Sequence, residues 1–187
     1  MFRANTHNNL PRIAVVIALV LGAAFFRLVP HPANFAPMTA VALFAGAHLA
    51  GFRWAAVVPV LAMFLSDLVL EVVTGQGFHS LMPVIYFAYA AVAFGAVALK
   101  QRSVARIAGA SVLASTWFFI VTNFGVWATG TMYPMSSAGL VACFTAAVPF
   151  FGATFAGDAF FTAVFFGGYA LAARWSPALA SATHAAA

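Results

Sequence analysis

The sequence predicts an all-α membrane protein with six transmembrane helices, and three observations support this fold class. First, 65% of the 187 residues are apolar and 6% are charged, whereas soluble domains carry about 25% charged residues. Second, the mean hydropathy of +1.02 extends over the whole chain without a long polar block. Third, the apolar runs are unbroken and do not alternate with period two, which favours helices over the strands of a membrane barrel. At about 20 residues per span, we predict one transmembrane domain over residues 1–175.

Prolines, glycines and charged clusters divide this domain into apolar runs, each of which predicts one span. The first run ends at Pro30, and the second and third are separated by a turn at Arg53. The predicted spans are 11–29, 37–51, 54–73, 81–99, 107–127 and 153–174. Pro149 and Gly152 predict a break that leaves a short extra outer segment before the last span. The Ala- and Ser-rich residues 176–187 predict a disordered tail.

The basic residues predict how the helices are oriented. With the N-terminus and the C-terminus both cytoplasmic, all Lys and Arg residues except Arg27 fall on the cytoplasmic side. The net charge of +5 is then explained by topology, and we expect no nucleic-acid partner beside the lipid bilayer. A signal peptide is the alternative for the first run, because Arg3 and Arg12 precede its apolar core. The single Cys143 excludes an internal disulfide.

Small residues recur on one face of the first predicted helix. Ala14, Ala18 and Gly22 are spaced by four, and such a stripe lets another helix approach closely. We interpret this face as a docking site for a partner protein. The alternative is that alanine is simply frequent throughout the chain.

Polar residues gather toward the predicted outer face, where hydrocarbon is expected. Charged groups at such depths cost about 2.5 to 3.5 kcal/mol, so they normally face a cavity or a partner. The candidate solute-binding residues are His31, Asn34, Asp67, Tyr86, Asn123, Tyr133 and Asp158. Glu71 lies one helical turn beyond Asp67, on the same face. The pattern predicts a solute pocket that opens to the outside.

Structural roles are the alternatives for several of these residues. Asp67 can pair with Arg27, because both lie near the outer face. Asp158 follows Gly157 and can cap the start of the last helix. The tyrosines can belong to an aromatic belt at the membrane interface.

Signals for catalysis are weaker than those for binding. A Gly-x-Ser-x-Gly motif is absent from the sequence, and the five histidines are scattered. We therefore predict a protein that is not an enzyme and has no cofactor of its own. Asp67 and Asp158 formally make a pair, so an intramembrane hydrolase is the alternative from a different class. A purely structural membrane scaffold is a third alternative.

Five parts of the sequence together suggest a family. They are residues 27–37, which contain Pro-His-Pro-Ala-Asn-Phe, residues 65–67, Tyr86, residues 123–127 and residues 149–158. These parts resemble the small bacterial inner-membrane cobalamin transporters, which are solitary relatives of the S-components of energy-coupling-factor (ECF) transporters. The resemblance extends over nearly all of residues 11–174.

The resemblance implies a six-helix protein in the bacterial inner membrane that takes up cobalamin or a related corrinoid from the periplasmic side. It implies that His31, Asp67 and Tyr86 bind this ligand. Ala14 and Ala18 are similar to the Ala-x-x-x-Ala motif with which S-components dock. The protein is therefore expected to act alone or with an ECF transmembrane and ATPase module.

The sequence departs from the family in the outer loop before the fourth predicted span. Members of the best-understood type have a cysteine there that can bind the corrinoid cobalt, whereas residues 76–82 contain none. His79 is the only strong metal ligand in this loop, so we predict it as the axial ligand of the cobalt, with Cys143 in the short outer segment as the alternative contact. The departure leaves a transporter for another vitamin or a metal as the alternative function.

Overall fold

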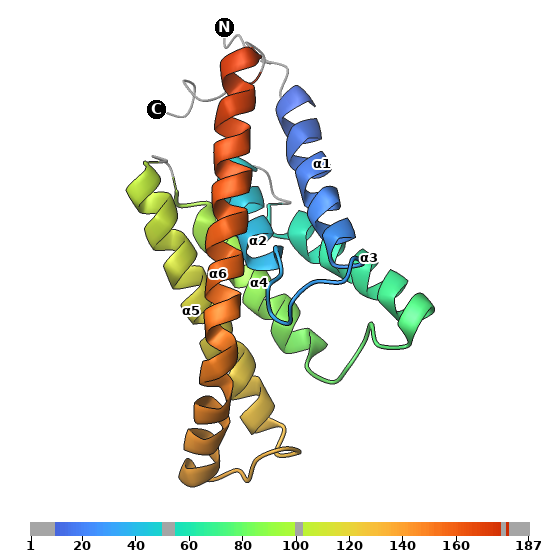
Figure 1. The fold of residues 1–187 in the computed structure, drawn as a ribbon, viewed down its shortest axis with the longest axis vertical. Helices are drawn as coiled ribbons and strands as arrows, with labels where there is room; N and C mark the ends of the chain where they lie inside the picture. Colours follow the sequence, from blue (N-terminus) through green and yellow to red (C-terminus); the bar gives the residue numbers. More distant parts are fainter. Residues whose placement is uncertain (1–9, 50–54, 100–102, 177–178, 180–187) are drawn as a thin grey trace, which may run out of the picture.

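The computed structural model describes residues 10–49, 55–99, 103–176 and 179, and within these ranges the chain forms six helices and no strand (Figure 1). The helices are α1 (Leu10–Phe26), α2 (Met38–His48), α3 (Val57–Thr74), α4 (Met82–Ala96), α5 (Val104–Ala128) and α6 (Ser137–Trp175). The all-α class predicted from the sequence is confirmed. The predicted tail lies outside the described residues except at its start and at Leu179.

Three of the helices, α3, α5 and α6, are long and apolar enough to cross a membrane. The other three are apolar but shorter, with 17 residues in α1, 11 in α2 and 15 in α4. The largest difference from the prediction concerns the second span, because α2 is about 16 Å long and a hydrocarbon core is about 30 Å thick. This helix alone is too short to cross the bilayer.

Instead, α2 is the centre of the molecule. Every one of its residues is buried, and it packs against each of the other five helices. Apart from Thr39 and His48 its residues are apolar, as expected for a helix surrounded by protein. Its contact with α4 is the closest, because a Cβ atom on Gly46 would overlap the carbonyl group of Ala93.

The predicted break at Pro149 and Gly152 is wrong. Residues Ser137–Trp175 form one continuous helix of 39 residues with Pro149 inside it. A proline removes one backbone hydrogen bond, which tertiary packing can offset. Here the ring of Phe119 in α5 packs on Phe144 and Phe151, on both sides of the proline, with centroids 5.7 and 4.8 Å apart. The expected short outer segment is therefore the first part of α6.

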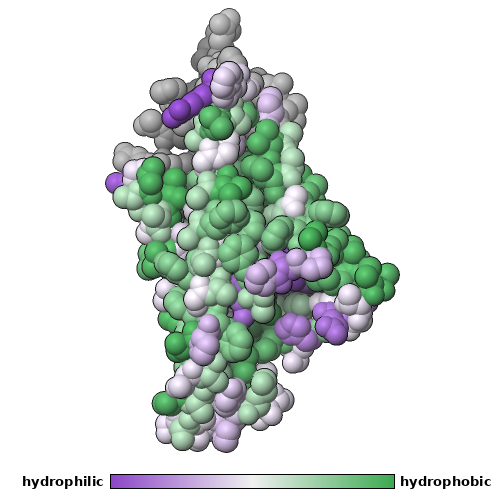
Figure 2. Space-filling model, viewed as in Figure 1, coloured by the Kyte–Doolittle hydropathy of each residue, from purple (hydrophilic) through white to green (hydrophobic). Residues whose placement is uncertain are grey.

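The six helices give the molecule two distinct ends (Figure 1). The start of α1 and the end of α6 lie at one end, whereas the turn between α5 and α6 lies at the other. The α1–α2 and α3–α4 connections lie partway along α6, so the α5–α6 hairpin extends beyond them. Figure 2 shows an apolar surface over most of the visible face, with hydrophilic residues near the α1–α2 and α3–α4 connections and others near the end of α6.

Candidate functional site

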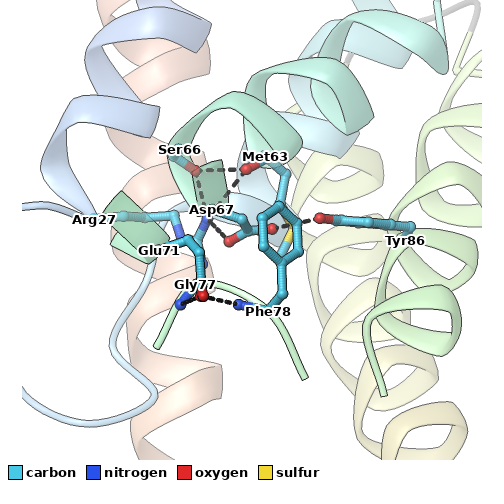
Figure 3. Close-up of polar contacts among 8 residues, drawn as sticks. All are labelled: Arg27, Met63, Ser66, Asp67, Glu71, Gly77, Phe78 and Tyr86. Atoms are coloured by element: carbon cyan, nitrogen blue, oxygen red, sulfur yellow. Dashed lines mark hydrogen bonds and ion pairs between the residues drawn. The ribbon is translucent and has the colours of Figure 1, made fainter. Parts of the chain in front are cut away.

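A buried ion pair joins the end of α1 to the middle of α3 (Figure 3). Arg27 Nη1 lies 2.6 Å from Asp67 Oδ1, and the Tyr86 hydroxyl of α4 donates a hydrogen bond of 2.7 Å to Oδ2. The side chain of Asp67 is fully buried, and that of Arg27 is 15% exposed. Among the described residues, Oδ1 has no hydrogen bond besides this ion pair. Two predicted site residues, Asp67 and Tyr86, therefore lie in contact.

Ser66 completes the cluster around Asp67. Its hydroxyl donates to the carbonyl of Met63 at 2.8 Å and accepts a hydrogen bond from Arg27 Nη1. Arg27 Nη1 also donates to the same Met63 carbonyl at 3.4 Å. The pairing with Arg27 is the structural alternative that the sequence offered for Asp67, and the cluster fastens α1, α3 and α4 together.

Glu71 shapes the connection between α3 and α4. Its Oε2 accepts hydrogen bonds from the backbone N–H groups of Gly77 at 2.9 Å and Phe78 at 3.1 Å (Figure 3). A Cβ atom on Gly77 would overlap the carbonyl oxygen of Asp67, so the connection folds back closely on α3. Glu71 thus has a structural role at the edge of the Asp67 cluster.

A separate pocket of about 320 Å³ lies between α5, the first half of α6, the α1–α2 connection and the α5–α6 connection. It brings together three predicted site residues from different parts of the chain: Asn34, Asn123 and Tyr133. Four phenylalanine rings line it as well, together with Cys143, which donates to the Asn123 carbonyl at 3.4 Å. Its lining is therefore aromatic with a few polar groups, as in sites for small molecules.

Local backbone features hold the polar groups of this pocket in place. Asn34 has a positive φ of 63°, a conformation that asparagine tolerates better than most residues. Asn123 Nδ2 donates to the Phe119 carbonyl at 2.7 Å. The connection that carries Tyr133 is closed by Trp127 Nε1, which lies 3.1 Å from the Pro134 carbonyl oxygen and 3.2 Å from that of Ser136.

The two histidines predicted on the outer side, His31 and His79, contact the backbone of the connections in which they lie. His31 Nδ1 lies 2.7 Å from the carbonyl oxygen of Val29, and the ring lies 5.3 Å from that of Phe26. His79 is exposed, and its Nδ1 accepts the backbone N–H of Leu81 at 3.3 Å. Neither histidine is among the residues that line the pocket. Within the described ranges, no three His, Cys, Asp or Glu side chains come together to hold a metal ion.

Asp158 belongs to a second buried polar cluster. It is 1% exposed, and it contacts Ser115 Oγ of α5 at 2.7 Å and the side chain of Thr39 at the start of α2. Ser111 of α5 and Thr162 of α6 extend the cluster, with 3.2 Å between their hydroxyl oxygens. Because Asp158 lies well inside α6, the alternative that it caps the start of a helix is wrong.

The hydroxyl partners of Asp158 were not among the predicted site residues. Their signal in the sequence is weak: Ser111 and Ser115 are spaced by one helical turn in an apolar helix, which places them on one face. That this face meets Asp158 depends on how α5 and α6 are rotated against each other. Only the structure shows that rotation.

The predicted docking stripe lies on the surface of α1. Ala14, Ala18 and Gly22 are all exposed, and a Cβ atom on Gly22 would meet no other atom within 4 Å. The docking role itself stays a prediction.

Comparison with known proteins identifies a family but no characterised relative. Neither a search of curated proteins nor a search of solved structures gave a match. A family model described as a family of unknown function, DUF6580, matches residues 7–179, a range that includes all six helices. The chain therefore belongs to the DUF6580 family.

Proposed function

We propose that the protein is a transporter of S-component type, which binds a solute in the pocket beside α5 and α6 and passes it across the membrane. The observation that supports this most strongly is the convergence of Asn34, Asn123 and Tyr133 in one aromatic pocket. These residues come from the α1–α2 connection, α5 and the α5–α6 connection, so the fold itself assembles the pocket. Such pockets, mostly aromatic with a few placed polar groups, are typical of small-molecule sites.

In the proposed arrangement, α3, α5 and α6 cross the bacterial inner membrane as long spans, α1 and α4 lie beside them, and α2 is enclosed by protein. The pocket then opens on the periplasmic side. Charge supports this orientation, because Arg106 lies near the start of α5 and Arg174 near the end of α6, and both of these helix ends lie away from the α5–α6 turn (Figure 1). Cytoplasmic loops are rich in such residues.

The resemblance to cobalamin transporters makes a corrinoid the first candidate for the solute. The pocket of about 320 Å³ is near the lower end of the range for drug-sized ligands, and cobalamin is much larger than these. We therefore propose that the pocket receives one edge of the corrinoid. The rest would cover the α1–α2 and α3–α4 connections, which carry His31 and His79, and we propose His79 as the axial ligand of the cobalt.

The same volume favours a second candidate, a smaller vitamin that fits entirely within the pocket. A hydrolase is less well supported by the geometry. Asp67 pairs with Arg27 and Tyr86, whereas Asp158 contacts Ser115 and Thr39, and a catalytic dyad requires two carboxyl groups that share one proton. In the proposed transporter, the Asp67 cluster positions the α1–α2 connection that brings Asn34 to the pocket.

The visible absorption spectrum of the purified protein tests the proposal. The protein is incubated with cobalamin, unbound ligand is removed, and the retained corrinoid is measured. We expect retention by the wild type, a clear loss in Asn123→Ala, and no change in Thr116→Val, which lies on the same helix but outside the pocket. If His79 is the axial ligand, His79→Ala retains less corrinoid and shifts its absorption.

A wild type that stays colourless rejects the corrinoid and leaves the smaller solute. Vitamins are then screened by thermal stabilisation of the same three proteins. A ligand that stabilises the wild type and Thr116→Val but not Asn123→Ala supports the pocket. Equal stabilisation of all three proteins contradicts it.

A further inference from the structure

The two buried aspartates have different kinds of partner. Asp67 contacts the positive charge of Arg27, which balances its own. Asp158 contacts hydroxyl groups, and within the described residues no arginine, lysine or histidine pairs with it. A carboxylate removed from water without a counter-charge is costly, and such a group avoids the cost by holding a proton. The contrast singles out Asp158 as the buried carboxyl group without a counter-charge among the described residues.

The hydrogen bonds of Ser115 support this distinction. Its Oγ lies 2.7 Å from Asp158 Oδ2 and also 3.0 Å from the carbonyl oxygen of Ser111. A serine hydroxyl has one proton, so it can make a full, linear hydrogen bond to only one of these two acceptors. With an ionised Asp158, one of the two short contacts would join two oxygens with no proton between them. With a protonated Asp158, both contacts become hydrogen bonds.

We propose that Asp158 is a proton-binding site and that the proton is bound in this structure. Asp158 Oδ2–H donates to Ser115 Oγ, and the Ser115 hydroxyl donates to the carbonyl of Ser111. The hydroxyl of Thr39 contacts the same carboxyl group from α2.

The groups around Asp158 agree with a neutral acid. Its neighbour on α5 is Ser115, which in turn contacts Ser111, and its neighbour on α2 is Thr39. The one ionisable group that α4 adds within electrostatic range is the buried Tyr89, whose hydroxyl is neutral in its ordinary state. None of these groups supplies a positive charge.

The site lies one helical turn from the solute pocket. Thr154 precedes Asp158 by four residues and Phe119 follows Ser115 by four, and both line the pocket. The proton site itself follows from the hydrogen bonds alone and does not depend on the proposed function.

Infrared spectroscopy of the purified full-length protein tests the proposal without any solute. The chain has only three acidic side chains, so the carbonyl stretch of a protonated carboxylic acid can be assigned cleanly. We expect this band at neutral pH in the wild type, with a shift in heavy water. It is lost in Asp158→Asn and kept in Glu71→Gln. Absence of the band from the wild type, or its persistence in Asp158→Asn, would overturn the proposal.

Isotope labelling keeps the test valid if Asp158→Asn does not fold. Wild-type protein made with aspartate labelled with carbon-13 at its side-chain carboxyl shifts the band if the acid is an aspartate. The same labelling in Arg27→Met/Asp67→Asn leaves Asp158 as the one labelled side chain, because the third acid is Glu71. A shifted band in that protein supports the assignment to Asp158, and no shift in either labelled protein contradicts it.

Discussion

Asp67, which the sequence predicts as a ligand contact, has structural contacts that tie three helices together. Its carboxylate is fully buried, and Arg27 supplies its only positive charge among the described residues. The pair joins the end of α1 to α3, and Asp67 is not among the residues that line the pocket between α5 and α6. Removing one partner of such a pair leaves the other charge buried and unpaired.

We therefore expect Arg27→Met to lower the free energy of unfolding by about 3 to 5 kcal/mol, the usual effect of breaking a buried ion pair. The double variant Arg27→Met/Asp67→Asn should recover part of the loss, because the unpaired charge is then absent. Denaturant unfolding of the purified proteins in detergent measures the free energy of unfolding of the single and the double variant. Equal stability of Arg27→Met and the wild type would contradict the structural role of the pair.

Residue types alone could predict only part of the candidate site. Asn34, Asn123 and Tyr133 were recognisable because polar side chains near the outer ends of apolar helices stand out from their surroundings. The contact between Asp158 and Ser115 was not recognisable, because serine is common in apolar helices and the contact joins residues 43 positions apart. Spacing along one helix does not show which face meets the next.

At the scale of the elements, hydropathy predicted where helices begin and end better than what surrounds them. The predicted span 81–99 became α4 (Met82–Ala96), and 107–127 became α5 (Val104–Ala128). The run 37–51 was equally apolar, yet it became the short central helix α2. Apolar side chains are suited both to lipid and to a protein interior, so hydropathy could not separate these two environments.

The close packing of α2 on α4 gives a prediction at this scale. Gly46→Ala places a Cβ atom against the Ala93 carbonyl, so the helices must separate. We expect a loss of stability of about 1 to 3 kcal/mol, as for other overpacked interiors. The control is Gly109→Ala in α5, where a Cβ atom meets nothing within 4 Å and alanine favours the helix. The melting temperatures of the two variants compare their stabilities. A Gly46→Ala protein as stable as the Gly109→Ala protein would contradict the close contact.

At the scale of the whole molecule, the two ends differ in chemistry. The pocket lies toward the end with the α5–α6 turn, and the predicted cytoplasmic residues Arg106 and Arg174 lie toward the other end. The overall class could be predicted because composition alone excludes a soluble domain. The pocket could not be located in advance, because it requires α6 to continue through Pro149 and form one wall with α5.

The central claim is that this pocket binds the solute, and a matched pair of bulky substitutions tests it most directly. Thr122 and Thr116 lie on α5 and each donates a hydrogen bond of 2.8 Å to the carbonyl four residues earlier, but only Thr122 lines the pocket. The affinity of each purified variant for cobalamin, or for the vitamin found in the screen, is measured by equilibrium dialysis. We predict that Thr122→Phe fills the pocket and weakens binding by at least about tenfold, a change of about 1.4 kcal/mol, whereas Thr116→Phe binds like the wild type. Equal affinities of the two variants would contradict the account.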